Sequence, residues 1–285
     1  MGAGALGSLF GTLIQLAGFD VIFVARGKQF EALKKSLKIS GLLDLTLKVN
    51  ATNTPEDADI TLITVKAYDT EKVAELLRSV DPGIVCSLQN GVGNEEILAK
   101  HFDVVGGITS YAANMVNYGH INYAGEGYTF LGDVNKPGLA NIVASIFKKS
   151  GIRVEVVENI EFRIWLKAAI NAVINPLTAI CRVKNGELLR NRYLWEIVQM
   201  IARECGEVMD KMGYSSDIIS EVKKVLELTA NNKSSMLQDI ERGKRTEIDY
   251  INGAFFKKGK ELGIALPVNL TLINLVKVIS GENGH

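Results

Sequence analysis

The spacing of hydrophobic positions changes near residue 158 of this 285-residue chain. Before that point, short apolar runs alternate with stretches in which apolar residues recur every three or four positions, the spacing of one helix face. Beyond it, only the helical spacing remains. Short buried strands that alternate with helices are typical of a parallel sheet covered by helices. The pattern therefore predicts an α/β domain over residues 1–157 and an all-α domain over residues 158–285.

The same pattern predicts the individual elements. Strands are expected over 21–25, 37–40, 45–51, 59–65, 83–88 and 153–157, with several more between 104 and 131 that Gly and Asn turns make antiparallel at one sheet edge. Helices are expected over 5–17, 29–36, 70–80, 137–150 and from Asn94 onward. The second domain is expected to contain long amphipathic helices over 160–181, 187–212, 215–229, 234–262 and 269–280.

Three glycines near the start, Gly2, Gly4 and Gly7, have the spacing G-x-G-x-x-G. In a dinucleotide-binding fold the first makes a tight turn, the second lets a pyrophosphate approach the backbone, and the third lets helix and sheet pack closely. The amides that open the following helix carry partial positive charge, which suits phosphates. The motif therefore predicts a Rossmann-like dinucleotide site, and a packing turn without a ligand is the open alternative. The expected cofactor contacts in this loop are Gly2, Ala3, Gly4, Ala5, Leu6 and Gly7.

One part of that pattern is missing, because the glycine motif should follow a strand and only Met1 precedes Gly2. A missing central strand leaves backbone groups on its two neighbours buried and unpaired, at a cost of about 1–3 kcal/mol each. We therefore expect the natural product to carry several more apolar residues before Met1. The intact mass of protein made from its own gene tests this expectation, and a mass that starts at Met1 refutes it.

Composition places the chain among globular proteins. Hydrophobic residues make up 47% of it, too many for disorder, and the net charge of zero gives no electrostatic footprint for nucleic acid. Charges interrupt the apolar runs before they reach the ~18 residues of a membrane helix. The cysteines Cys86, Cys181 and Cys205 form neither a metal motif nor an evident disulfide framework. We expect a cytoplasmic protein with no metal, nucleic-acid or membrane partner.

A basic residue stands where a Rossmann-like fold selects its nucleotide. In NAD-binding members, an acidic residue about 20 positions after the fingerprint binds the ribose hydroxyl. This chain has Arg26 there, with Lys28 beside it. A guanidinium binds phosphate bidentately, so the position favours NADP(H). NAD(H) beside a solvated basic turn stays open.

Two polar residues follow predicted strands, Lys66 after the strand 59–65 and Asn90 after the strand 83–88. Ligands of open α/β sheets bind beyond the carboxyl ends of the strands. Both side chains are therefore candidates for contacts with cofactor or substrate. A surface lysine and a turn asparagine are the alternatives.

In the second domain, Lys167, Asn171 and Asn175 recur every four residues in an otherwise apolar stretch. They share one helix face, and a polar stripe on a buried helix needs hydrogen-bond partners or a ligand. Pro176 is expected to kink this helix or help end it. A second polar segment, 234–249, is rich in hydroxyls and charges, and spacing alone does not single out Glu247 within it.

Taken together, these stretches resemble the ketopantoate reductase (2-dehydropantoate 2-reductase) family. The resemblance covers nearly the whole chain, and its helical motifs are more specific than the glycine loop. The missing first strand is the one clear departure. The motifs are residues 2–11, Val65-Lys-Ala-Tyr68, Gln89-Asn-Gly91, Lys167…Asn171…Asn175-Pro-Leu-Thr-Ala179, Ser234-Ser-Met-Leu-Gln-Asp239, Thr246-Glu-Ile-Asp249 and Ile251-Asn-Gly253.

The resemblance implies a fold, a reaction and residue roles. The fold would be a Rossmann-like domain followed by a helical domain like the C-terminal domain of 6-phosphogluconate dehydrogenase. The reaction would be the NADPH-dependent reduction of 2-dehydropantoate to (R)-pantoate, on the route to pantothenate and coenzyme A. Lys167 would be the general acid, and Glu247 would contact the substrate hydroxyl. The other implied contacts are Asn171, Asn175 and Ser235 with substrate, Lys66 and Asn90 between cofactor and substrate, and Arg26 with the 2′-phosphate.

Two other interpretations of the whole chain stay open. One is a reductase of the wider 6-phosphogluconate or glycerol-3-phosphate dehydrogenase type that acts on another 2-oxo acid or a phosphorylated substrate. The other is a nucleotide-sensing protein without turnover. A homodimer and a monomer are also both open. A further hypothesis gives Cys86 a feedback role through a mixed disulfide with coenzyme A, against the simpler alternative of a buried, inert thiol.

Overall fold

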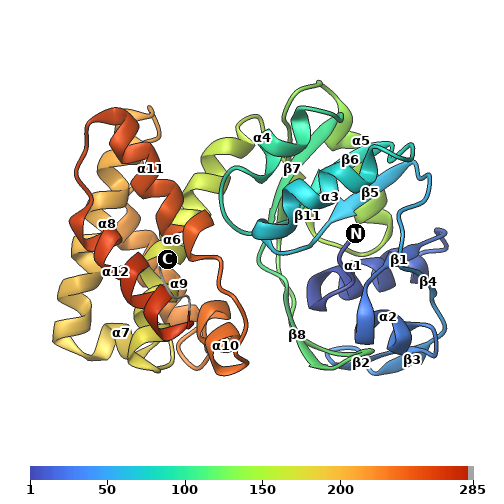
Figure 1. Cartoon of the computed structure of the whole chain (residues 1–285), viewed down its shortest axis with the longest axis horizontal. Helices are drawn as coiled ribbons and strands as arrows, with labels where there is room; N and C mark the ends of the chain where they lie inside the picture. Colours follow the sequence, from blue (N-terminus) through green and yellow to red (C-terminus); the bar gives the residue numbers. More distant parts are fainter. Residues whose placement is uncertain (282–285) are drawn as a thin grey trace. The chain divides into compact units, whose positions relative to one another are not determined.

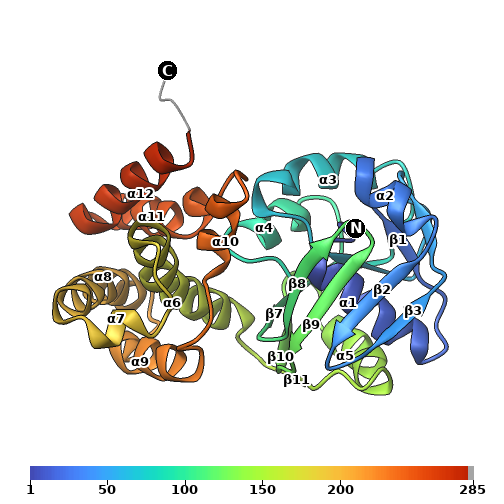
Figure 2. The same ribbon diagram turned by 90° about the horizontal axis from the view of Figure 1, so that it is seen from below.

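The computed structural model describes residues 1–281, and its internal contacts divide into two compact units. One unit comprises Met1–Gln89 and Asn94–Glu161, and the other comprises Asn90–Gly93 and Phe162–His285. Strands and helices alternate in the first unit, and the second is built from helices (Figures 1 and 2). The predicted order of an α/β domain before an all-α domain is therefore confirmed. The boundary between residues 157 and 158 stays a proposal.

The largest sheet of the first unit has the order β11-β10-β7-β6-β5. Its first three strands in the sequence run parallel to one another, β10 is antiparallel to β7, and β11 is parallel to β10. Parallel pairing places the carboxyl ends of β5, β6 and β7 at one edge, where ligands of such sheets bind. The strands are β5 (Ile60–Ile63), β6 (Ile84–Ser87), β7 (Val104–Thr109), β10 (Thr129–Asp133) and β11 (Val154–Val156).

Two smaller sheets complete the first unit. One has two parallel strands, β1 (Ile22–Val24) and β4 (Asn50–Thr52). The other has the order β3-β2-β9-β8, and the expected single strand over 45–51 is divided between the two sheets. The strands of the four-stranded sheet are β2 (Leu37–Gly41), β3 (Leu45–Leu47), β8 (Ala112–Asn117) and β9 (His120–Gly125).

The expectation of antiparallel edge strands throughout 104–131 is wrong for β7. This strand lies inside the large sheet, parallel to β6 on one side and antiparallel to β10 on the other. The glycines of β7 suggested turns in the sequence. In the structure, Gly107 is required because neighbouring side chains leave no room for a Cβ. A Cβ on Gly107 would lie 2.7 Å from the side chains of both Leu131 and Leu88.

Helices cover both faces of the large sheet. On one face, α1 (Ala5–Leu16) and α5 (Leu139–Lys149) share a core in which Phe10 packs edge-on against Phe147 at 5.4 Å. On the other face, α3 (Thr70–Leu77) and α4 (Asn94–Ala99) pack against buried residues of β5, β6 and β7. The helix α2 (Gly27–Leu33) follows β1. This layering fixes the start of α1, where the glycine motif lies.

The first residues of the chain lie between β1 and β5. The Met1 amine donates a hydrogen bond to the Leu62 carbonyl at 2.7 Å, and the Gly2 amide donates to the Val24 carbonyl at 3.1 Å. A cavity of about 550 Å³ extends from this point between the two strands. In the described part of the chain, β1 pairs with β4 alone and β5 with β6 alone. Met1 and Gly2 thus lie between two strands that are not paired with each other among the described residues.

The second unit contains eight described helical segments, and the longest of them, α6 (Ile160–Cys181), is central. Two expected helices are interrupted. Within the expected helix 187–212, the Asn191 side chain accepts hydrogen bonds from the amides of Tyr193 and Leu194 and so begins a new helix. The expected helix 234–262 is divided into two α-helices and a 3₁₀ turn. The remaining elements are α7 (Glu187–Arg190), α8 (Arg192–Lys211), α9 (Ile218–Leu228), α10 (Ser235–Glu241), the 3₁₀ turn η2 (Ile248–Tyr250), α11 (Asn252–Leu262) and α12 (Pro267–Ile279).

The helix α6 is the core of the second unit. Its 22 residues and a mean hydropathy of 1.4 make it long and apolar enough to cross a membrane, a property that the interrupted apolar runs did not suggest. However, 67% of the 18-residue window of α6 that has this hydropathy is buried inside the protein, as in the core helix of a globular domain. Trp165 packs edge-on against Phe255 of α11 at 5.0 Å. The helix continues through Pro176 to Cys181, so the proline does not end it.

Candidate active site

The three glycines of the motif have three different surroundings. Gly2 has a φ of +87°, and a Cβ there would lie 2.6 Å from Val65 Cγ1. Gly7 packs against the Gly2 carbonyl and the Thr64 hydroxyl so closely that no side chain fits. Gly4 precedes α1, and a Cβ on it would meet nothing nearer than the Gly2 carbonyl at 3.9 Å. These are the turn, the close packing and the open approach that a pyrophosphate site requires.

Side chains from elsewhere in the α/β unit hold this loop in place. The Thr64 hydroxyl lies 2.8 Å from the Gly2 carbonyl oxygen and 3.0 Å from that of Met1. The Gln29 amide donates to the Ala3 carbonyl at 2.7 Å. The N-cap residue of α1 is Gly4, which has no side chain to cap the helix. The uncapped amides and the partial positive charge of this helix end suit an anionic group.

Arg26 lies two residues beyond the end of β1 and is exposed, as is Lys28. Arg26 is the residue before α2, and its backbone is extended. The structure thus puts two cations beyond the carboxyl end of the strand that follows the glycine helix. This is the position where a Rossmann-like fold reads the ribose of its nucleotide.

Lys66 is half-buried beyond β5, just before the 3₁₀ turn η1 (Ala67–Asp69). A network that the sequence analysis missed fixes this loop. The Gln89 amide donates to the Val65 carbonyl at 3.1 Å and to the Thr70 hydroxyl at 2.8 Å, and Thr70 donates to Asn94 Oδ1 at 2.8 Å. These contacts join the loops after β5 and β6. The sequence feature that could have indicated this network is the position of Gln89 near the end of a predicted strand, beside Asn90.

Asn90 lies in the segment 90–93, which clusters with the helical unit. The Val92 amide donates to the Tyr250 carbonyl at 2.9 Å. Gly91 has a φ of +87°, and a Cβ there would lie 2.8 Å from the same oxygen. Tyr250 is in turn bonded through its amide to the Glu247 carbonyl at 3.0 Å. Short backbone contacts therefore connect the Asn90 loop with the segment that carries Glu247.

The polar stripe on α6 crosses the buried part of that helix. Lys167 and Asn171 are half-buried, and Asn175 is only 4% exposed. Beyond it, the Thr178 hydroxyl donates to the Ser234 hydroxyl oxygen at 2.7 Å. Ser234 accepts a bond from the Leu237 amide at 3.1 Å and so caps α10, which begins with the exposed Ser235.

Glu247 is 5% exposed and immediately precedes η2. Its neighbour Thr246 is also buried, and the Thr246 hydroxyl has no hydrogen-bond partner among the residues that the structure describes. A buried hydroxyl inside a helical unit needs a partner or a ligand. Of the candidate site residues, the helical unit holds Asn90, Lys167, Asn171, Asn175, Ser235 and Glu247. The glycine loop, Arg26 and Lys66 belong to the α/β unit.

The structure does not support the feedback hypothesis for Cys86. The side chain is fully buried in β6. Burial, with a further contribution from the Glu95 carboxylate, raises the pKa of the Cys86 thiol well above its usual value. Thiolates are the reactive form, so this cysteine is inert in the folded protein.

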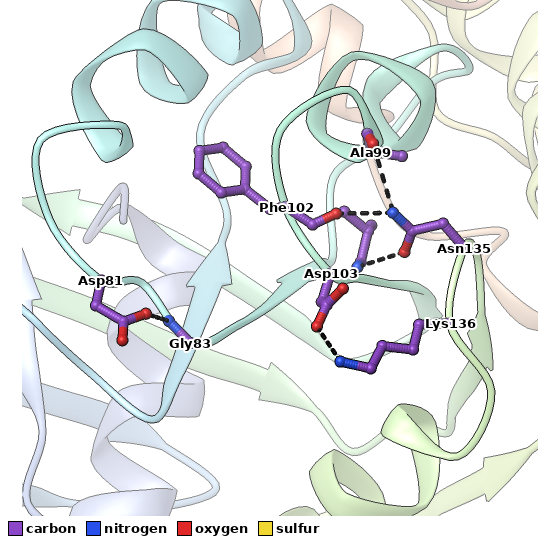
Figure 3. Close-up of polar contacts among 8 residues, drawn as sticks. Asp81, Gly83, Ala99, Phe102, Asp103, Asn135 and Lys136 are labelled. Atoms are coloured by element: carbon purple, nitrogen blue, oxygen red, sulfur yellow. Dashed lines mark hydrogen bonds and ion pairs between the residues drawn. The ribbon is translucent and has the colours of Figure 1, made fainter.

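A surface depression of about 690 Å³ lies at the amino ends of β6 and β7. Several of its polar groups bond to neighbouring residues (Figure 3). The Asn135 amide donates to the Phe102 carbonyl at 2.7 Å, and Lys136 pairs with Asp103 at 2.6 Å. Since ligands of open α/β sheets bind at the opposite strand ends, we do not assign this depression a function. No group of three or more potential metal ligands occurs within residues 1–281.

Comparisons with known proteins agree along the whole chain. The family description "Ketopantoate reductase PanE/ApbA" matches residues 1–136, and "Ketopantoate reductase PanE/ApbA C terminal" matches residues 159–280. The 2-dehydropantoate 2-reductase of Archaeoglobus fulgidus is 63% identical over 280 residues, which are 97% of this chain and 95% of that protein. The enzyme of the same name from Pyrococcus abyssi is 38% identical, with the same coverage of both chains.

Solved structures share the fold. A PanE/ApbA family ketopantoate reductase from Ralstonia eutropha superposes with a TM-score of 0.92 at 31% identity, covering 99% of this chain and 97% of that one. A D-mandelate dehydrogenase, solved with NADH and anilino(oxo)acetate, has a TM-score of 0.92 at 26% identity, with coverages of 98% and 96%.

Proposed function

The chain belongs to the ketopantoate reductase family, and we propose that it catalyses the NADPH-dependent reduction of 2-dehydropantoate to (R)-pantoate. The observation that carries this proposal is the 63% identity, over almost the full length, with an archaeal enzyme of that name. The product would enter the synthesis of pantothenate and coenzyme A. The enzyme would work in the cytoplasm on a small-molecule substrate.

The α/β unit has the features that a nicotinamide dinucleotide requires. The open space at Gly4 and the uncapped amides of α1 fit a pyrophosphate, and the exposed Arg26 fits a 2′-phosphate. Lys66, just beyond β5, would lie close to the cofactor. When bound, the cofactor supplies the hydride. NADP(H) is the proposed cofactor, while the NADH-bound neighbour supports the broader class of nicotinamide nucleotides.

Lys167 is the proposed proton donor. Reduction of the C2 ketone builds negative charge on its oxygen, and an ammonium within hydrogen-bond reach stabilises that charge and donates a proton. Lysine side chains carry this proton at neutral pH. The half-buried position of Lys167 on the core helix α6 restricts its conformations, which favours a fixed donor.

The remaining candidates suit a small anion that carries a hydroxyl group. Amide and hydroxyl groups bind carboxylate and carbonyl oxygens, and a carboxylate accepts a hydrogen bond from a substrate hydroxyl. Glu247 would accept from that hydroxyl. The proposed substrate contacts are Asn90, Lys167, Asn171, Asn175, Ser235 and Glu247.

A second candidate function has its own support. The D-mandelate dehydrogenase structure matches this chain as closely in fold as the ketopantoate reductase structure does, although its identity is lower. A reductase for another 2-oxo acid, with NADH as donor, is therefore the alternative that most needs a direct test.

A single assay separates these functions. The oxidation of NADPH and NADH is followed with 2-dehydropantoate, with the 2-oxo acid that corresponds to D-mandelate, and with a phosphorylated substrate. We expect the highest kcat/KM with NADPH and 2-dehydropantoate. A preference for the mandelate-type acid would replace the proposed substrate, and cofactor binding without turnover on any acid would indicate a nucleotide sensor.

A further inference from the structure

The backbone of α6 contains one carbonyl group that the helix itself cannot satisfy. Pro176 has no N–H group, so the carbonyl of Ala172, four residues earlier, lacks its helical donor. Ala172 is 0% exposed, so bulk water does not take the place of that donor. Buried carbonyl groups without partners are rare, and a side chain from outside α6 has to supply the bond.

Asn252, the first residue of α11, supplies it. The Asn252 amide nitrogen donates to the Ala172 carbonyl at 2.9 Å and also to Asn269 Oδ1 at 2.9 Å. Both N–H bonds are thus used, whereas Asn252 Oδ1 has no partner among residues 1–281. A flipped amide would point its oxygen at two acceptors. The two bonds therefore hold the side chain in one orientation.

Glu204 of α8 orients Asn269 in turn. Its carboxylate accepts bonds from the Asn269 side-chain amide at 2.7 Å, the Asn269 backbone amide at 2.9 Å and the Val268 amide at 2.8 Å. A carboxylate at the amino end of α12 is also favoured by the helix dipole. A continuous chain of hydrogen bonds therefore runs from α8 through α12 and α11 to the interrupted turn of α6.

We propose that Asn252 is a positioning residue that aligns the polar stripe of α6. The proposal rests on the proposed function, in which Lys167, Asn171 and Asn175 act on the substrate. Asn171 directly precedes Ala172, and Asn175 directly precedes Pro176. The carbonyl that Asn252 holds therefore lies between the two amides, where a proline weakens the helix.

Loss of this bond would let the turns before and after the proline shift relative to one another. Lys167 and Asn171 would move with the first turn, and Asn175 with the second. Misplacement of catalytic groups by about 1 Å is enough to lower a rate by up to ~10²-fold. The inferred role of Asn252 thus concerns turnover of the oxo acid and not the binding of the nucleotide.

The decisive experiment is a double-mutant cycle of Asn252→Ala with Pro176→Ala in the full chain. In the chain that keeps Pro176, we expect Asn252→Ala to lower kcat/KM for 2-dehydropantoate about tenfold, with the Kd of NADPH changed less than about twofold. Alanine at position 176 restores a backbone N–H for Ala172. In that background, the same Asn252→Ala change should cost no more than about twofold.

Two further variants keep the outcome interpretable. Leu226→Ala, in α9, removes a fully buried side chain from the same unit and should lower the Tm without a tenfold loss of kcat/KM. Asn252→Leu, which keeps a side chain of similar size but has no donor, replaces Asn252→Ala in the cycle if the alanine variant does not fold. Equal losses in both backgrounds, or full activity of a folded Asn252→Ala protein, would overturn the proposal. A wild-type chain without reductase activity would overturn the proposed function instead, and hydrogen exchange of α6 in the same proteins would then decide whether Asn252 holds the turn.

Discussion

Thr178 of α6 donates a hydrogen bond to Ser234, the residue that caps α10, across 2.7 Å. Thr178 is 0% exposed and Ser234 is 5% exposed. Thr178 follows Asn175 within one helical turn, and Ser234 directly precedes Ser235. One buried bond between neighbours thus couples two proposed substrate contacts that come from distant parts of the sequence.

Thr178→Val should separate this coupling from the rest of the fold. Valine keeps the shape but removes the donor, so we expect the free energy of unfolding to fall by about 1–2 kcal/mol and the KM for 2-dehydropantoate to rise. Urea denaturation and initial rates measure the two effects. Thr271→Val is the matched control, because the exposed Thr271 hydroxyl donates to the Pro267 carbonyl of its own helix at 2.8 Å and has no other partner among the described residues. An unchanged KM in Thr178→Val would show that Ser235 does not depend on this bond.

Lys167→Ala should lower kcat by at least ~10²-fold, the lower range for loss of a general acid. The Kd of NADPH should stay near the wild-type value, since Lys167 belongs to the helical unit. Steady-state rates and a fluorescence titration with NADPH test both statements. Lys184→Ala, which removes an exposed lysine shortly after α6, is the control for loss of one positive charge. A kcat close to wild type in Lys167→Ala would remove this residue from the mechanism.

Arg26→Asp should reverse the cofactor preference. The substitution replaces a cation that suits a 2′-phosphate by a carboxylate that repels it and can accept a bond from a ribose hydroxyl. The KM for NADPH should rise at least about tenfold, which corresponds to the loss of a charged hydrogen bond, and the KM for NADH should stay level or fall. Lys35→Asp is the comparison, an exposed charge reversal just after α2. If both variants retain the wild-type ratio of KM values, Arg26 is only a solvated turn residue.

In protein produced with Met1 as its first residue, the buried amine of Met1 should make stability depend on pH. Burial lowers the pKa of this amine from 8.0 to about 5. Between these values, the unfolded chain binds a proton that the folded chain does not. The free energy of unfolding should therefore decrease as the pH falls from 8 towards 5, by about 1.4 kcal/mol per pH unit from this group, and level off below.

Chemical denaturation at several pH values measures this slope. The same chain with an acetylated amino terminus is the control, because an acetyl group cannot titrate and the cavity of about 550 Å³ beside Met1 has room for it. Identical slopes for the two proteins would show that the Met1 amine is solvated.

Periodicity predicted the order of strands and helices well because each element of the pattern is local. The helix at Ala5, the cations after β1 and the stripe on α6 all follow from spacing within a few residues. Long-range pairing is different. Gly107 resembles a turn residue in the sequence, and only the side chains of Leu88 and Leu131, packed on either side of it, explain why it lies inside β7.

The site shows the same division between local and long-range information. The strand-end rule pointed to Lys66 and Asn90, but it could not show that Asn90 clusters with the helical unit through the bond between Val92 and Tyr250. Nor does spacing indicate that the break at Pro176 is compensated by Asn252, because the two residues are brought together only by the packing of α11 on α6. Their shared presence in family motifs was the sole hint.

The bond between Val92 and Tyr250 also limits how this protein can be dissected. A fragment cut from residue 162 onward would contain Tyr250 but not the loop that donates to its carbonyl, and a fragment that ends at residue 161 would carry that loop away from its packing partner. Separate expression of the two halves would therefore yield neither half intact. A gene that deletes residues 94–161 and joins residues 90–93 through a short linker to residue 162 would be the better starting point for studying the helical unit alone.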